Sequence, residues 1–350
     1  MQTETRHQEI VIDCPASEAS GLLAIENREV LRAHGWDIAF WICSDEATVE
    51  ESLAALGRKR DGTWEAIHPR KVRPSRNRPT EDSEALAHWN GQVWVFGSQF
   101  GKKEGPLSSR RQFVARFDER ALSGRIDQTE IDLEVVRGSF QLHRLINDAL
   151  RASGLELIER GEREAKEYVG KARKKGKSTG KTWADRIEPD DWPVNLEAAT
   201  FTSWGTLLLG LRYPVTRQGQ PILLELTDFE AFFQDGAQPT VRAVRVLDVG
   251  TPEEPRGFRA LELVGDEIHA ITGCLDSSPD ASVVVQEHPE GARAISHHHR
   301  LVFRDGELKV HAERVHVVED ETRIEGLSTD SQGKFWYVLD DEKIRLLQAG

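Results

Sequence analysis

Cysteine, methionine and long apolar stretches are scarce in this sequence of 350 residues. The three cysteines, Cys14, Cys43 and Cys274, are odd in number and widely spaced, which argues against a disulfide framework and for reduced, buried thiols. No stretch approaches the ~18 consecutive apolar residues of a membrane-spanning helix. The first residues, MQTETRHQEIVIDCP, lack the basic start and apolar run of a signal peptide. We therefore predict a cytoplasmic protein with no membrane partner.

An excess of positive charge is also missing. The 46 Lys and Arg residues are outnumbered by 59 Asp and Glu residues, which leaves a formal net charge of −13. Such a chain is a poor general binder of nucleic acid or anionic membrane, although a local basic patch can still act. The 9 Trp and 13 Phe residues recur along the chain and can fill a core. The composition is therefore that of a folded protein, not of a disordered one.

A weak internal repeat is the most informative feature that is present. Each copy is a short apolar run, a polar turn with Gly or Asp, and a second apolar run. This pattern is typical of a β-hairpin. Four copies of equal length occupy residues 84–97, 197–210, 259–272 and 325–338. A looser fifth copy joins residues 20–25 to residues 37–44 through a longer turn.

The spacing of these hairpins predicts sheets of four strands. Further strand-like runs follow the hairpins, at residues 111–117, 131–137, 221–226 and 241–249. The last copy lies too close to the end of the chain to complete a sheet alone, and residues 7–14 can supply its missing outer strand. We therefore predict an all-β protein with a single domain, residues 1–350. It would be a β-propeller of about five, alternatively six, four-stranded blades. Unrelated hairpins in a β-sandwich are the alternative.

The long interval between the hairpins at residues 84–97 and 197–210 predicts an insertion at about residues 138–191. Apolar residues at helical spacing indicate helices over residues 140–150 and 155–174. Residues 171–181 form a basic run, which we expect to be a mobile, solvated loop. It contains Gly176-Lys177-Ser178 but has Lys171 where a phosphate-binding loop needs Gly, so we reject a nucleotide site. Nucleic acid is expected as a partner only through this basic run.

Three of the segments resemble a known family. Residues 84–98 (EALAHWNGQVWVFGS), 195–214 (NLEAATFTSWGTLLLGLRYP) and 324–341 (IEGLSTDSQGKFWYVLDD) are similar to motifs of the family called domain of unknown function 3616, DUF3616. The resemblance covers roughly residues 18 to 345. It implies a β-propeller of the kind seen in phytase-like and esterase-like proteins, with no established activity. The sequence departs from the pattern at Gln99, where the family often has His.

The first residue of each hairpin is the main candidate for function. In an up-and-down blade, the start of the first strand and the end of the second meet at the same face. The residues expected around one mouth of a central channel are Glu84, Glu197, Arg259 and Glu325 at strand starts, and Gln99, Arg212, Asp276, Asp340 and Asp341 at strand ends, with Arg110 and Arg111 nearby. Asp45 and Glu46 would take the same place in the first blade.

Carboxylates at the crowded start of inner strands need partners, which leaves three interpretations. Glu84, Glu197 and Glu325 could hold Ca²⁺ or another divalent metal, which prefers oxygen ligands. The arginines could hold a small anionic ligand by paired hydrogen bonds. In the third interpretation the network is only structural, and each Glu bonds to a neighbouring loop and pairs with Arg259.

The triplet His297-His298-His299 precedes a strand-like run. Alternation along a strand would send His297 and His299 to one face and His298 to the other. No partner has the spacing of a zinc site, so we expect a solvated turn or sheet edge.

Two classes of function remain open at this point. One is a hydrolase for a phosphate ester, or for a carboxylic ester or lactone, at the channel mouth and with or without a divalent metal. The other is a non-enzymatic scaffold that binds a ligand or a protein partner, because propellers host many unrelated functions.

Overall fold

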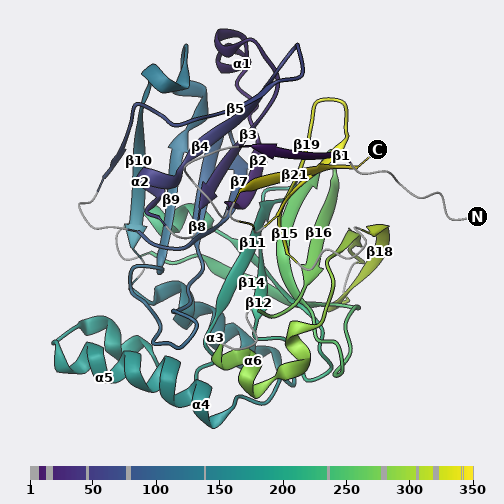
Figure 1. Ribbon diagram of the computed structural model, residues 1–350. Helices are drawn as coiled ribbons and strands as arrows, with labels where there is room; N and C mark the ends of the chain where they lie inside the picture. The colour runs from purple at the N-terminus through teal and green to yellow at the C-terminus, as the bar shows by residue number, and fades with distance from the viewer. Residues whose placement is uncertain are drawn as a thin grey trace, which may run out of the picture. The chain divides into compact units, whose positions relative to one another are not determined.

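The computed structural model describes residues 8–12, 19–44, 47–75, 80–137, 139–234, 237–276, 282–304, 307–317, 323–339, 341 and 343–349. Figure 1 labels helices and strands of the described residues. The chain divides into two compact units. Unit 1 comprises Met1–Phe96, Ala115–Val135 and Arg323–Gly350, and unit 2 comprises Gly97–Val114 and Val136–Thr322.

Unit 1 contains most of three sheets. The first has the strand order β1-β21-β20-β19, the second β2-β3-β4-β5, and the third β6-β10-β9-β8-β7. The strands are β1 (Gln8–Ile12), β2 (Ala19–Ala24), β3 (Trp36–Ser44), β4 (Ala54–Lys59), β5 (Trp64–Ile67), β6 (Lys71–Pro74), β7 (Ser83–Trp89), β8 (Gln92–Gly97), β9 (Phe113–Asp118), β10 (Glu130–Arg137), β19 (Ile324–Thr329), β20 (Phe335–Leu339) and β21 (Ile344–Gln348). Helices α1 (Arg28–His34) and α2 (Val49–Ser52) lie between these strands in the chain.

Unit 2 contains two four-stranded antiparallel meanders, β11–β14 and β15–β18, joined into one sheet of eight strands. The junction is a short parallel pairing of β14 with β18. The strands are β11 (Asn195–Phe201), β12 (Leu207–Tyr213), β13 (Ile222–Thr227), β14 (Thr240–Leu247), β15 (Gly257–Val264), β16 (Glu267–Gly273), β17 (His297–Val302) and β18 (Lys309–Val317).

The predicted fold class, an all-β propeller, is confirmed, but one sheet departs from the predicted four strands, because β6 pairs parallel with β10 as a fifth strand. Every hairpin of the repeat is an antiparallel strand pair, and the later runs form the third and fourth strands of their sheets. The longer turn of the loose copy is helix α1. As predicted, the N-terminal run completes the last sheet: β1 pairs antiparallel with β21, from Gln8 opposite Gln348 to Ile12 opposite Ile344.

The leading residues of the hairpins share one local geometry. In β11, Leu196 and Ala198 have partners on β12 and Glu197 between them has none. The same register shift passes over Arg259 in β15 and Glu325 in β19. Each of these residues is therefore the extra residue of a β-bulge, a device that turns a side chain out of the alternating pattern.

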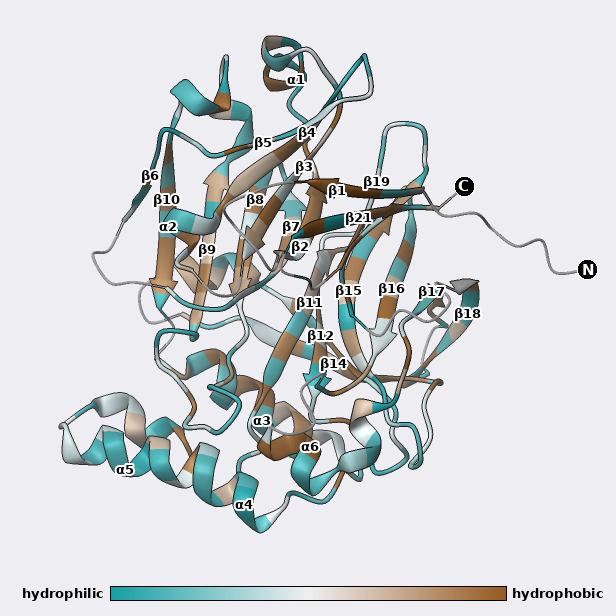
Figure 2. Ribbon diagram, in the orientation of Figure 1, coloured by the Kyte–Doolittle hydropathy of each residue, from teal (hydrophilic) through white to brown (hydrophobic). Residues whose placement is uncertain are grey.

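The insertion is helical, as predicted, but its basic part is not a loop. Helix α3 (Gln141–Ser153) buries Leu142, Ile146 and Leu150, which recur every four residues on one face. A second helical stretch runs through α4 (Glu162–Glu164), a π-helix (Ala165–Gly170) and α5 (Lys171–Ser178). The prediction of a loop was wrong because the buried residues Ala172 and Gly176, four apart, give this charged segment a face that packs. Figure 2 shows the remainder of α5 as largely hydrophilic.

Apolar residues on the strands form the cores of both units (Figure 2). In unit 1 one cluster includes Phe40, Trp336 and Leu346, and in unit 2 another includes Leu208, Phe258 and Leu301. Cys43 and Cys274 are buried free thiols, as expected, and Cys14 lies outside the described residues. Within the described ranges no helix combines the length and the apolar character needed to cross a bilayer.

Candidate functional sites

Glu197 is the centre of a buried ion cluster in unit 2. Its side chain is only 5% exposed. One carboxylate oxygen, Oε1, accepts hydrogen bonds from Nη1 of Arg212 and from Nδ2 of Asn195, the latter at 3.0 Å. The other oxygen, Oε2, lies 3.2 Å from Nη1 of Arg259. Two guanidinium groups therefore surround one carboxylate in a region shielded from water.

Local structure explains why these three residues meet. Glu197 and Arg259 are the bulge residues of the first strands of neighbouring meanders, β11 and β15. Arg212 stands near the end of β12, which pairs with β11. Its Nε also donates to the carbonyl oxygen of Cys274 at 3.2 Å, just past the end of β16. The predicted meeting of strand starts and strand ends is therefore found within unit 2.

Gln99 lies in a loop that docks on the same strand. The backbone N–H of Leu196 donates to the carbonyl of Ser98 at 2.7 Å, which places Gln99 beside the Glu197 segment. The Gln99 side chain is 1% exposed and donates to the carbonyl of Gly97 at 3.0 Å. Its backbone has φ of 62°, a left-handed conformation that is rare for residues other than Gly. Gln99 therefore supports the loop through backbone contacts.

The other predicted site residues are more scattered. Arg111 is half-buried and donates from Nη1 to the carbonyl of Gly101 at 2.8 Å, whereas Arg110 is exposed. Glu84 and Glu325 are half-buried residues of β7 and β19 in unit 1. Asp340 lies outside the described residues. Convergence of the Glu84, Glu197 and Glu325 carboxylates on one metal stays a prediction, and the Glu197 oxygens already face two guanidinium groups and an amide.

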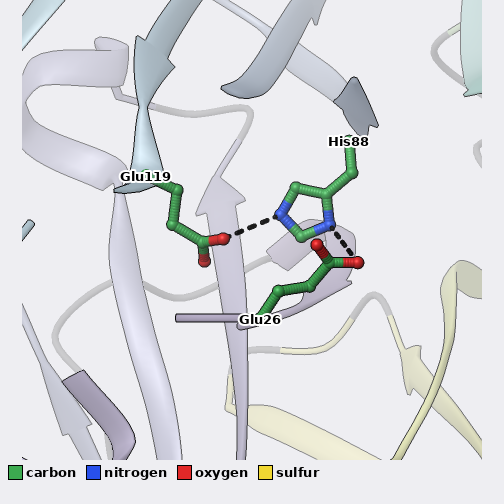
Figure 3. A group of neighbouring side chains, drawn as sticks. All are labelled: Glu26, His88 and Glu119. Carbon is green, nitrogen blue, oxygen red and sulfur yellow. Dashed lines mark ion pairs between the residues drawn. The ribbon is translucent and has the colours of Figure 1, made fainter. Parts of the chain in front are cut away.

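A second group of candidate ligands, which the sequence analysis missed, lies in unit 1. Glu26, His88 and Glu119 each offer one atom, and these atoms lie within 4.8 Å of one another (Figure 3). Nε2 of His88 is 3.3 Å from Oε2 of Glu119, and Nδ1 is 3.6 Å from Oε1 of Glu26. The imidazole ring therefore lies between two carboxylates.

Strand ends assemble this group. Glu26 follows β2, His88 is near the end of β7 and Glu119 follows β9, so all three lie at ends of first or third strands. Nδ2 of Asn27 donates to the carbonyl of Glu119 at 2.7 Å and ties the segment after β2 to the segment after β9. Nε1 of Trp41 donates to Oε1 of Glu119 at 2.8 Å and orients that carboxylate.

The electrostatics of the group favour positive charge beside Glu119. Glu119 is 2% exposed, and a buried carboxylate is costly unless it is paired. Among the described residues, His88 is the only ion-pair partner of Glu119 and of Glu26, and no Lys or Arg pairs with either. The separations of 3.3 and 3.6 Å exceed the ~2.7–2.9 Å of charge-assisted hydrogen bonds. The three side chains thus offer a nitrogen and carboxylate oxygens as candidate metal ligands.

In the sequence, the one sign of this group is that His88 differs in residue type from the equivalent positions of the other hairpins. At the position of His88, the other three hairpins of equal length carry Phe201, Leu263 and Thr329. Glu26 and Glu119 belong to no sequence pattern that relates them, because they follow strands of different sheets.

The histidine triplet is not a solvated turn, and that expectation was wrong. His297, His298 and His299 begin β17, which lies between β16 and β18 in the sheet. His298 and His299 are buried, because strands on both sides cover them. The predicted alternation holds: His298 faces His269, with 2.9 Å between ring nitrogens, while His297 and His299 contact each other with ring centroids 5.9 Å apart.

Comparisons with known proteins identify no relative by sequence. No protein-family model matches the chain, and no curated protein matches it. Among solved structures, it is similar to a glucose dehydrogenase, with 10% identity, a TM-score of 0.42, and coverage of 98% of this chain and 99% of that chain. A streptogramin B lyase matches with 11% identity, a TM-score of 0.36, and coverage of 99% and 98%. A virginiamycin B lyase from Staphylococcus aureus matches with 10% identity, a TM-score of 0.34, and coverage of 99% and 100%.

Proposed function

We propose that this β-propeller is a hydrolase for a small phosphate or carboxylic ester and that Glu26, His88 and Glu119 hold a divalent metal ion for the reaction. The observation that carries the proposal is the buried Glu119 carboxylate, whose only ion-pair partner among the described residues is an imidazole. We therefore assign the metal to this group and not to the predicted set Glu84, Glu197 and Glu325, because Glu197 already pairs with Arg212 and Arg259.

The donor set fits a borderline metal such as Zn²⁺. One imidazole and two carboxylates are common ligands of catalytic zinc, and such sites keep an open position. Two ligand atoms at ~2.0–2.1 Å from a tetrahedral zinc lie about 3.3 Å apart, which agrees with the 3.3 Å between His88 and Glu119. Glu26 is 67% exposed, so its carboxylate can rotate toward the same ion without disturbing the core.

The roles of the protein groups follow from their burial. His88 and Glu119 are fixed ligands, since Trp41 and the surrounding strands hold Glu119 in place. Glu26 borders solvent, so substrate and water would enter on its side. A divalent ion bound here would polarise an ester oxygen and lower the pKa of a coordinated water.

Metal analysis and calorimetry of the purified chain test the proposal. We expect about one equivalent of Zn²⁺ or Mn²⁺ to bind, and His88→Gln and Glu119→Gln to weaken binding at least tenfold. His311→Gln is the matched control, because His311 also lies between two carboxylates, Asp248 at 2.7 Å and Glu307 at 3.5 Å, but on an exposed strand. Equal metal binding by all these proteins would overturn the metal site.

A panel of phosphate esters, carboxylic esters and lactones then tests catalysis. Turnover that requires added metal and is lost in His88→Gln supports the hydrolase. Metal binding without turnover of any ester class would overturn the hydrolase and leave a metal-binding scaffold.

The scaffold alternative has an observation of its own. Lys174, Lys175, Lys177 and Lys181 are exposed on and just after α5, an unusual concentration of positive charge in this acidic chain. An acidic protein segment is the partner that such a surface would attract. Replacement of these four lysines by Gln would abolish the capture of such a partner and leave metal binding unchanged.

A further inference from the structure

A cavity in unit 2 lies outside both groups described above. Its volume is about 360 Å³, at the lower end of the ~300–1,000 Å³ of small-molecule pockets. The residues that line it come from the segment after β14 and from β17 and β18. Those that carry the argument are Glu254, Arg256, His297, His299 and Arg314.

Backbone packing fixes the segment that carries Arg256. The segment turns at Gly250, with φ of 88°, beside Gly219, with φ of 75°. A Cβ atom on Gly250 would lie 2.2 Å from the carbonyl oxygen of Gly219. The two backbone segments therefore approach too closely for any residue other than Gly at position 250. The N–H of Arg256 donates to that same carbonyl at 2.9 Å. The position of Arg256 is thus set by the fold.

The charged groups at the cavity do not cancel. Arg256 is 5% exposed and pairs with Glu254, and its Nη1 donates to the carbonyl of Ile295 at 2.8 Å. Arg314 is exposed and, among the described residues, has no Asp or Glu partner. Among the residues that line the cavity, one carboxylate therefore faces two guanidinium groups, and the nearby Asp248 pairs with His311 outside this set. A net positive pocket is unusual in a chain whose net charge is −13.

The two histidines add neutral hydrogen-bonding groups. Nε2 of His297 lies 2.9 Å from Nη2 of Arg314 and 3.5 Å from Nη2 of Arg256. A guanidinium group only donates, so this nitrogen accepts, and the proton of His297 is on Nδ1. His299 is 3% exposed; its Nε2 is 3.1 Å from the hydroxyl of Thr272, and its buried Nδ1 has no hydrogen-bond partner among the described residues.

The pKa directions agree with this picture. Burial, followed by the charges of Arg256 and Arg314, lowers the pKa of His297 to about 3 and that of His299 to about 4. Both rings are therefore neutral near pH 7, and the positive charge of the pocket comes from the arginines alone.

We propose that this cavity binds a small molecule through a single oxyanion group, a carboxylate or a phosphate, held between Arg314 and Arg256. One oxyanion compensates the excess guanidinium charge, and such hydrogen bonds are strong because both partners are charged. The buried Nδ1 of His299 gains a partner when a polar ligand enters. The site lies wholly in unit 2 and does not depend on the proposed metal-dependent activity.

Calorimetric titration of the metal-free full chain at low ionic strength tests the site. The probes are inorganic phosphate, phenyl phosphate and benzoate, with benzyl alcohol as the uncharged counterpart. We expect at least one anion to bind with one-to-one stoichiometry and the alcohol not to bind. Preference for the phosphates or for benzoate decides between the two oxyanions. Failure of all three anions at millimolar concentration would overturn the proposal.

Two variants locate the site. Arg314→Gln removes an exposed charge without opening the core, so we expect the protein to fold and to bind the anion at least tenfold more weakly. Arg217→Gln is the control, because Arg217 is an exposed arginine of the same unit, 72% exposed, that does not line the cavity. Equal losses in both variants would reveal only general charge attraction and would overturn the pocket. As an independent readout, the imidazole NMR signals of His297 and His299 should shift during the titration.

Discussion

Glu197 and Arg259 occupy equivalent positions, each the bulge residue near the start of its strand, and their side chains meet with 3.2 Å between Nη1 and Oε2. The repeat therefore uses one backbone device to present opposite charges from neighbouring meanders. Because a bulge interrupts the ladder at a single residue, the charge leaves the alternating pattern without ending the strand.

Glu197→Gln should destabilise the protein by about 3–5 kcal/mol, because it removes the carboxylate that pairs with the buried guanidinium groups of Arg212 and Arg259. Chemical denaturation measures the change. The control is Glu134→Gln, which breaks the more exposed pair between Glu134 and Arg116, at 2.8 Å, and should cost about 0–1 kcal/mol. Similar costs for the two variants would contradict a structural role for the buried cluster.

Trp41→Phe should weaken metal binding at the His88 group by about 10- to 100-fold, because the carboxylate of Glu119 loses the hydrogen bond that orients it. Phe retains the aromatic contact with Phe117, now 5.3 Å between ring centroids, so the core should remain packed. Zinc titrations of both proteins give the ratio. Unchanged affinity would mean that the indole does not position the ligand.

Acid should destabilise the protein before its carboxylates titrate. The pKa values of His297 and His299 fall from an ordinary value of 6.5 to about 3 and about 4, through burial and through Arg256 and Arg314, against a smaller opposite effect of Asp248 on His299. Below pH 6.5 these two histidines therefore bind protons in the unfolded chain but remain neutral in the folded chain. The contribution of the two neutral histidines to the free energy of unfolding is complete above pH 6.5 and is lost as the pH falls toward their folded pKa values of about 4 and about 3.

The free energy of unfolding between pH 7 and pH 5 measures this effect. The double variant His297→Gln/His299→Gln should show a shallower pH dependence than the parent protein, whatever its absolute stability. His311→Gln, which removes a half-exposed histidine, is the control. A slope that is identical in the double variant and the parent would refute the assignment.

Gly250→Ala should lower the free energy of unfolding by more than the strain of a positive φ alone, because the added Cβ would lie 2.2 Å from the carbonyl oxygen of Gly219. Gly265→Ala, at φ of 63° and with nothing within 4 Å of its Cβ, provides the control for strain alone. We expect about 1–2 kcal/mol for the control and a larger loss for Gly250→Ala, with weaker anion binding as Arg256 shifts. Equal losses would contradict the close approach.

Deletion of residues 1–12 should expose the edge of β21 and favour self-association, because the backbone groups that now pair with β1 lose their partners. Size-exclusion chromatography and thermal unfolding measure the effect. A synthetic peptide of residues 7–14 should reverse the association when it is added in excess. A truncated chain that associates no more than the full chain and is equally stable would contradict this role of β1.

Much of the fold could be predicted from the sequence, because strands and turns leave local patterns. The alternation and turn residues of 84–97 and 197–210 fix each hairpin, and the short final copy already required an outer strand from residues 7–14. The pairing of strand starts with strand ends also placed Glu197, Arg212 and Arg259 together, since it follows from antiparallel geometry alone.

The predictions that were wrong or missing concern residues whose burial depends on segments distant in the sequence. His297–Val302 is polar at its start and resembles a turn, yet β16 and β18 cover it on both sides. The run 171–181 is dominated by charge, and its helix forms because small residues pack on one face. Glu26 follows a strand of one sheet, whereas His88 lies in a strand of another and Glu119 follows a non-adjacent strand of that second sheet, so no spacing in the sequence relates them.

The parallel pairing of β14 with β18, through Val246 opposite Lys309 and Leu247 opposite Val310, joins two meanders by backbone bonds as well as by side chains. The amides of β11–β14 and β15–β18 should therefore become accessible to hydrogen exchange in one cooperative opening. A ligand that stabilises either half would slow exchange across the whole eight-stranded sheet.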